Sequence, residues 1–134
     1  MSADDNIKTV QAAYEAFGRG DVAAIQDMCT DDVDWGTEAA SMSAPWYGAK
    51  YGKAGVAAFF EAFGSVSEVN EFTPLVFTSN DNDVMTVVRF RVTTPGSGKT
   101  AEMNLHHHFA FRDGKISHYR GSEDTELTVE RLSS

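Results

Sequence analysis

The sequence predicts a single α+β domain, residues 1–134, in which antiparallel strands cover a group of helices. Two observations lead to this fold class. Apolar residues recur at helical spacing up to about residue 63, and from residue 66 onward they alternate with a period of two. Helices followed by strands are typical of α+β architecture. Because such a sheet has one apolar face to cover, we expect it to wrap around the helices.

The first helix has clear start and stop signals. Ser2 and Asp5 have the spacing of a capping box, with Asp5 in place of the more usual Glu. An apolar stripe follows over residues 7–17, and Gly18 and Gly20 then end the helix.

A second, shorter helix and a short strand are expected next. Asp21 caps the helix, Asp31 and Asp32 close it, and residues 33–35 form the strand. The residues that share the apolar face of this helix are Val22, Ile25, Met28 and Cys29.

Residues 36–52 are irregular and rich in Gly, Ser and Ala. A loop of this length in a compact domain is usually functional or mobile, so it is a candidate lid. A third helix follows over about Ala54 to Phe63, and Gly64 is expected to end it.

Long strands occupy the second half of the chain. Pro95–Gly98 is a turn, and Asp113-Gly114 is a hairpin signal. The last dozen residues are polar and are expected to pack loosely. The four predicted strands are Val66–Thr78, Val84–Thr93, Thr100–Arg112 and Ile116–Ser122.

Charge and composition exclude several classes of partner. The net charge of −9 repels phosphate backbones and anionic lipid, so we expect neither a nucleic acid nor a membrane partner. Cys29 is the only cysteine, so no intramolecular disulfide can form. The polar N-terminus does not resemble a signal peptide, and the cytoplasm is the expected location.

Three stretches carry a family resemblance: residues 14–35 (YEAFGRGDVAAIQDMCTDDVDW), 46–60 (WYGAKYGKAGVAAFF) and 98–125 (GKTAEMNLHHHFAFRDGKISHYRGSEDT). Together they resemble the SnoaL-like and ketosteroid-isomerase-like proteins of the nuclear-transport-factor-2-like superfamily. The resemblance implies a cone-shaped, strongly curved sheet wrapped around three helices, an internal pocket, and a homodimer formed through the outer sheet face. It implies no particular activity, because the superfamily includes isomerases, polyketide cyclases, epoxide hydrolases, dehydratases and non-catalytic binding proteins.

His107 is the leading candidate for chemistry. Side chains alternate along a strand, so His107 points to the opposite face from His106 and His108. We expect it in the cavity, a position at which the resembling proteins also carry His. There it would act as a general acid or base, or as a core histidine bonded to Tyr14 or Tyr119. The apolar residues on the face of His107 are Met103, Leu105, Phe109 and Phe111.

His106 and His108 form an HxH pair on the other face. Zinc would need one or two further ligands there, and His118 is the only histidine left. A position on the outer sheet face, either buried in a dimer interface or exposed to solvent, explains the pair better. No metal or cofactor is expected.

The register of the last hairpin has two alternatives. A two-residue Asp-Gly loop pairs Arg112 with Lys115 and places Arg120 opposite His107. A three-residue loop with a bulge at Gly114 places Tyr119 there instead. The resemblance favours an inward Tyr119, whose hydroxyl would reach His107 or a ligand carbonyl.

Aromatic and apolar side chains are expected to form the pocket wall. The resemblance places Tyr14 and Trp35 at the cavity, and Tyr14 is a candidate proton donor. Phe77 is a further aromatic candidate, whereas Arg89 is expected to be a solvated charge on the outer face. The expected ligand-binding residues are Trp35, Trp46, Phe59, Met85 and Phe109.

The carboxylates of the resembling enzymes are largely missing. Ketosteroid isomerases use an acidic base after the first strand, where this chain has Thr37 with Glu38 beside it. Polyketide cyclases use an acid on the last strand, just past the YR pair, where this chain has Gly121. Glu123 and Asp124 are near, but are expected too close to the rim to substitute.

Three functions therefore remain in competition. The first is acid–base catalysis on a small carbonyl-containing or polycyclic substrate, with His107 as base, Tyr119 or Tyr14 as donor and Trp35 as wall. The second is binding of a small apolar or carbonyl-containing molecule without turnover. The third is a dimeric interaction module whose cavity is filled by its own aromatic side chains. A second titratable group beside His107 would favour the enzyme.

Overall fold

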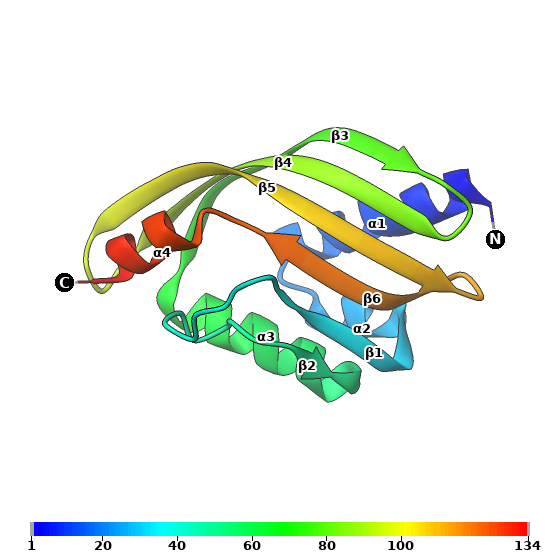
Figure 1. Ribbon diagram of the computed structural model, residues 1–134, viewed down its shortest axis with the longest axis horizontal. Coiled ribbons are helices and arrows are strands. Elements are labelled where there is room, and N and C mark those ends of the chain that lie inside the picture. Colours follow the sequence, from blue (N-terminus) through cyan, green and yellow to red (C-terminus); the bar gives the residue numbers. More distant parts are fainter. Residues whose placement is uncertain (1, 134) are drawn as a thin grey trace.

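A six-stranded mixed sheet curls over the helices in the computed structural model, which describes residues 2–133 (Figure 1). The sheet is open, and its strand order is β2-β1-β6-β5-β4-β3. All neighbouring strands are antiparallel except β1 and β6, which run parallel. The strands are β1 (Cys29–Thr37), β2 (Lys50–Tyr51), β3 (Glu68–Ser79), β4 (Asp83–Thr94), β5 (Lys99–Arg112) and β6 (Lys115–Ser122).

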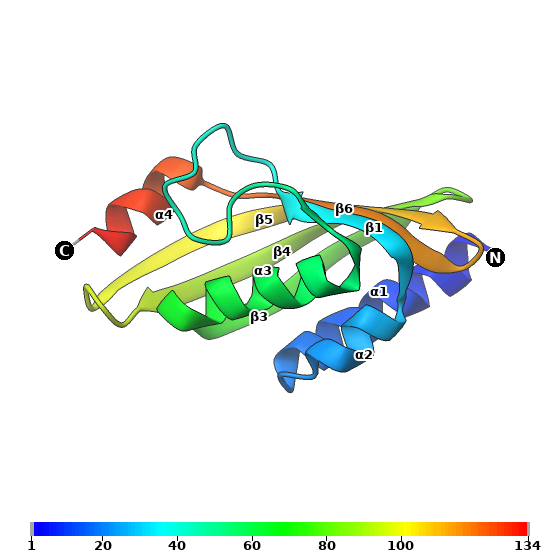
Figure 2. The same cartoon turned by 90° about the horizontal axis from the view of Figure 1, so that it is seen from below.

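Helices α1 (Ala3–Gly18), α2 (Val22–Asp27) and α3 (Gly52–Val66) cover the concave face of the sheet (Figure 2). The predicted capping box of α1 is confirmed, because the Ser2 hydroxyl accepts from the Asp5 amide at 3.2 Å and Asp5 accepts from the Ser2 amide at 3.4 Å. Between them, the helices and the sheet bury the larger of two apolar clusters, which includes Val10, Ile25 and Phe109.

Two predicted helix ends are wrong. The second helix was expected to run to Asp31, but Cys29 already belongs to β1, where it pairs with Ile116 of β6. Gly64 does not end the third helix, which continues to Val66. Glycine is tolerated inside a helix at a modest cost, and the packing of Phe63 and Val66 on the core outweighs that cost.

The C-terminal segment is also more ordered than expected. It forms a fourth helix, α4 (Thr125–Leu132), whose N-cap Asp124 accepts a hydrogen bond from the Leu127 amide at 3.0 Å. Leu127 packs against a second apolar cluster on β4 and β5 that includes Val88 and Phe90. Helix α4 therefore packs beside one end of the sheet, near β5 (Figure 1).

The hairpin between β5 and β6 has the two-residue turn of the first alternative, but both predicted partners of His107, Arg120 and Tyr119, are wrong. Asp113 and Gly114 have positive φ angles of 53° and 79°, and the two-residue turn pairs Arg112 with Lys115. A bulge then leaves Ser117 without a cross-strand partner and shifts the register by one residue. In consequence Tyr119 lies opposite Phe109, Arg120 opposite His108, and Gly121 opposite His107.

The loop over residues 38–49 is anchored rather than free. Ala44, Trp46 and Tyr47 are buried, and the short strand β2 that follows pairs with β1. Within residues 2–133 no helix is long and apolar enough to cross a membrane.

Candidate functional site

A cavity of about 80 Å³ lies between the concave face of the sheet and helices α1 and α3. Its wall is mostly aromatic, with few polar groups. All of the predicted site residues except Met85 line it, namely Tyr14, Trp35, Trp46, Phe59, His107, Phe109 and Tyr119.

Met85 is placed wrongly by the prediction. It lies on the outer face of β4, where 45% of its surface is exposed, because its neighbour Thr86 takes the inward position. Arg89 also lies outside, as expected, and forms an ion pair with Glu102 at 2.9 Å. Phe77 contacts Tyr14 but does not line the cavity.

Three side chains from three elements form a hydrogen-bonded chain in the cavity. Tyr14 of α1 brings its hydroxyl within 2.7 Å of Nδ1 of His107 on β5, and within 2.6 Å of the Thr86 hydroxyl on β4. His107 is 6% exposed. Burial lowers its pKa to about 3, and the positive charge of neighbouring His106 acts in the same direction. The imidazole is therefore neutral near pH 7.

The direction of this chain sets the tautomer of His107. When Nδ1–H donates to Tyr14 and Tyr14 donates to Thr86, Nε2 carries a free lone pair. When Thr86 donates to Tyr14 and Tyr14 donates to Nδ1, Nε2 carries the proton. Because each hydroxyl can rotate, the chain supports a pocket-facing acceptor or donor with the same heavy-atom positions.

Tyr119 is the second polar group at this end of the cavity. Its ring stacks on Trp35 with 4.3 Å between centroids and lies 5.2 Å from the ring of His107. Burial raises the pKa of its hydroxyl well above the usual value, so it remains a donor. Gly121 makes room for this arrangement, since a Cβ atom there would overlap the Tyr119 hydroxyl and lie 3.3 Å from Cδ2 of His107.

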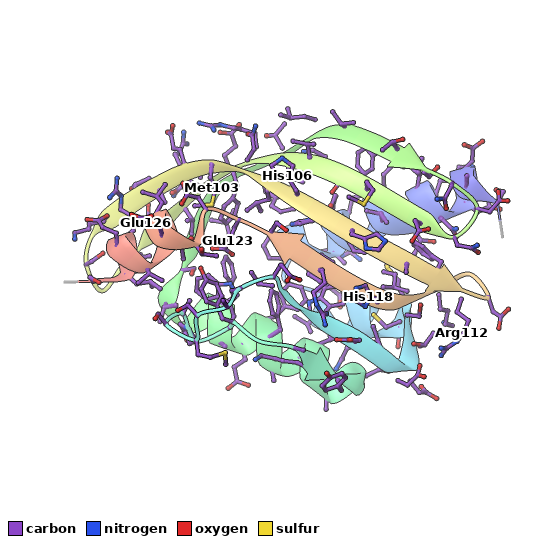
Figure 3. The ribbon with its side chains drawn as sticks, viewed as in Figure 1. Met103, His106, Arg112, His118, Glu123 and Glu126 are labelled. Carbon is purple, nitrogen blue, oxygen red and sulfur yellow. The ribbon has the colours of Figure 1, made fainter. Side chains whose placement is uncertain are left out.

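Glu123, which was expected too close to the rim to take part, is a buried carboxylate of the site. It lines the cavity between α4 and the loop over residues 38–49 (Figure 3). Its carboxylate accepts from the Thr128 hydroxyl at 2.5 Å, the Tyr47 hydroxyl at 3.1 Å and Trp46 Nε1 at 3.4 Å. Burial raises its pKa, although these three bonds act in the opposite direction.

The helix that covers Glu123 had a signal in the sequence. Asp124 directly after a strand is a helix N-cap candidate, and a helix there folds back over the strand end. Thr37 lines the cavity, as its alignment implied, whereas Glu38 is exposed. Burial raises the pKa of Cys29 to about 11, so this thiol stays protonated.

The other histidines lie on the outer face of the sheet. His106 is exposed (Figure 3), and His108 bonds through Nε2 to Asp83 at 2.8 Å. The His118 ring lies 5.7 Å from that of His108. Across residues 2–133 no three His, Cys, Asp or Glu side chains gather closely enough to hold a metal ion.

The fold is thus an open, curved sheet wrapped over helices around an aromatic cavity. The chain belongs to the SnoaL-like family, since the model of the SnoaL-like domain matches residues 10–119. A search of curated proteins gives no match.

Solved structures agree on the fold. An NTF2-like protein of unknown function from Burkholderia pseudomallei is 24% identical with a TM-score of 0.90, and each chain is covered completely. TerC, co-crystallised with polyporic acid, is 26% identical with a TM-score of 0.85, and the match covers 97% of this chain and 99% of TerC. A candidate polyketide cyclase from Xanthomonas campestris pv. campestris is 21% identical with a TM-score of 0.78, and the match covers 99% of this chain and 100% of that protein.

Proposed function

We propose that this protein binds a small, largely apolar carbonyl compound and transfers a proton at the carbon next to the carbonyl group. The observation that carries the proposal is the hydrogen-bonded chain from Thr86 through Tyr14 to His107, which ends in the cavity. Such a chain fixes the orientation of the imidazole and lets Nε2 act as acceptor or donor, as a general acid–base group requires.

The proton moves between the substrate carbon and Nε2 of His107. When Nδ1–H of His107 donates to Tyr14, Nε2 has a free lone pair and takes the proton from the carbon. The electron pair of the broken C–H bond forms an enolate, whose oxygen accepts a hydrogen bond from Tyr119. Return of the proton to the same or another carbon completes an exchange or an isomerisation.

The low pKa of His107 is compatible with this role. In the empty pocket a positive charge on the ring is disfavoured by desolvation. An enolate beside the ring supplies the opposite charge and favours the imidazolium. Weak bases are known to act in apolar sites where donors stabilise the oxyanion.

The similarity to TerC supports the proposal that this pocket binds a small organic ligand. At 26% identity over nearly both whole chains, its complex with polyporic acid makes that compound a reasonable probe for this protein. The remaining structures share the fold and carry no argument about the reaction.

Hydrogen–deuterium exchange at the α-carbon tests the proposal without knowledge of the substrate. Small aromatic and cyclic ketones are incubated with the protein in D₂O, and the α-proton signals are followed by NMR. We expect exchange above the buffer rate, a loss of about 10²- to 10⁴-fold in His107→Ala, and a smaller loss in Tyr119→Phe. His106→Ala is the matched control, because it removes a histidine next to His107 that faces away from the cavity.

Binding without turnover is the second candidate. It is favoured by the low pKa of His107 and by Gly121, which leaves no carboxylate directly opposite the ring. Ligands that raise the melting temperature of the wild type but not of His107→Ala, with no α-proton exchange in either, would establish this function instead.

A further inference from the structure

A second cavity lies directly beside the first. It has a volume of about 390 Å³ and opens between the end of α1, the start of α2, the end of α3 and the start of β3. The residues that line both cavities form a mainly aromatic partition between them, and they are Tyr14, Phe17, Ile25, Phe60, Phe63 and Phe72.

The inner cavity is too small for most ligands of the proposed class. Sites for small molecules usually enclose about 300–1,000 Å³, well above the 80 Å³ found here. A ligand larger than a single ring therefore extends beyond this inner cavity, and the second cavity, called the outer cavity below, offers a volume directly beside it.

Different interactions bound the inner cavity at its two ends. At the α4 end, Glu123 holds Trp46, Tyr47 and Thr128 through hydrogen bonds. Apart from Tyr14, whose hydroxyl is hydrogen-bonded to His107 and Thr86, the partition consists of ring contacts, such as Phe17 with Phe72 at 5.1 Å and with Phe63 at 6.3 Å. Ring contacts shift without leaving polar groups unpaired, so the partition opens at a lower cost than the Glu123 end.

The outer cavity also restricts what can occupy it. Its lining carries no charged side chain within the part of the chain that the structure describes, and three of its residues, Gly18, Gly20 and Gly64, present only backbone. An uncharged alkyl or aryl group fits such a surface, whereas a carboxylate or ammonium group would lose its hydration there without a partner.

We propose that the ligand is an elongated molecule whose apolar tail crosses the aromatic partition and lies in the outer cavity between Gly18 and Gly64. The position of its carbonyl end at His107 and Tyr119 rests on the proposed function. The position of the tail rests only on the two cavities and their shared wall.

Alkyl phenyl ketones of increasing length, from acetophenone to octanophenone, test the proposal by titration calorimetry. We expect the affinity of the wild type to rise about fourfold for each added methylene, as full burial of that group implies. Gly64→Leu and Gly18→Leu should abolish this rise and leave acetophenone binding unchanged. A Cβ at either glycine meets nothing within 4 Å, so both variants should fold.

Gly96→Leu is the control, since Gly96 has equally open surroundings but lies in the turn between β4 and β5, far from either cavity. An affinity that stays flat with chain length in the wild type would overturn the proposal, and so would a length dependence that persists in both blocked variants. A length dependence that persists in His107→Ala would support the tail site and contradict the placement of the carbonyl group at His107. The two proposals are therefore tested separately.

Discussion

Gly121 lies directly opposite His107 in the pairing of β5 with β6, and the volume that a side chain at Gly121 would occupy is taken by the hydroxyl of Tyr119. The pocket thus carries a phenol at the place where the resembling cyclases carry an acid. The two arrangements compete for one volume, because the Tyr119 ring packs against Trp35 and Phe109 with its hydroxyl where a Cβ at Gly121 would lie.

Gly121→Ala should therefore destabilise the protein by about 1–3 kcal/mol, the usual cost of overpacking a core. Chemical denaturation measures this change. Gly96→Ala, where a Cβ meets nothing within 4 Å, should change the free energy of unfolding by no more than about 0.5 kcal/mol. Equal stability of the two variants would show that Tyr119 is not confined as described.

Tyr14→Phe should cost about 1–3 kcal/mol, because it leaves the buried Nδ1 of His107 without a partner. A double-mutant cycle with Thr86→Val should reveal coupling, since Tyr14 bonds both residues. Tyr51→Phe is the control, because Tyr51 is 69% exposed. Additive effects of the Tyr14 and Thr86 substitutions would rule out the chain.

Stability should fall as the pH is lowered from about 6.5 toward 3. The pKa of His107 is lowered to about 3 in the folded protein, so the unfolded chain binds the proton more tightly over this range. The slope from this group is at most about 1.4 kcal/mol per pH unit. The pKa of Glu123 is raised above its ordinary value of 4.5 in the folded protein, so this group increases stability as the pH is lowered toward 4.5.

Subtracting the unfolding free energy of a His107 variant from that of the wild type isolates the contribution of His107. The difference in unfolding free energy between the wild type and His107→Gln should shrink between pH 6.5 and 4.5. The curve of His106→Gln should stay close to that of the wild type, because burial is a larger cause of the lowered His107 pKa than His106 is. Parallel curves for His107→Gln would mean that His107 titrates normally in the folded protein.

Glu123→Ala should loosen two segments together. Its carboxylate bonds Tyr47 in the loop and Thr128 in α4, so its removal frees both. Amide hydrogen exchange should accelerate in residues 44–47 and in 125–132. Glu126→Ala changes an exposed residue of the same helix and should leave residues 44–47 unaffected. Acceleration confined to α4 in Glu123→Ala would show that the loop is held by other contacts.

The outer sheet face should form a homodimer. Val76 and Met85 are 48% and 45% exposed there, and Val76 lies in register with Val87 on the neighbouring strand. Met85→Glu would bury a charge in such an interface and should give a monomer in analytical ultracentrifugation at micromolar concentration. Met42→Glu, in the loop and 71% exposed, should remain dimeric. A monomeric wild type would disprove the dimer.

The face of His107 could be predicted from the sequence because strand alternation is a local property that depends on one residue spacing. The same alternation places Met85 on the face of Arg89 and opposite to the face of Val88. The outward position of Met85 could therefore have been predicted, and its assignment to the pocket contradicts the alternation. An inward Tyr119 was expected, but its partner was not, because the bulge at Ser117 is set by the fit of β6 into the sheet.

Glu123 illustrates what sequence patterns do not contain. Its burial and its raised pKa depend on Trp46 and Tyr47, which come from a distant irregular loop, and on a helix that packs over it. Neither contact has a periodic signature. Helix ends failed for a related reason, since the tertiary packing of Phe63 and Val66 carries α3 past Gly64.

The parallel pairing of β1 with β6 also dictates the order in which the molecule can be assembled. Trp35 and Tyr119 are stacked neighbours, although most of the chain lies between them. While the protein is being synthesised, one edge of β1 stays unpaired and the Trp35 ring lacks its stacking partner Tyr119 until β6 has left the ribosome. The pocket is therefore absent from every nascent form that lacks β6. Substitutions that weaken the docking of β6 should lower the yield of folded protein in the cell before they lower its affinity for the ligand.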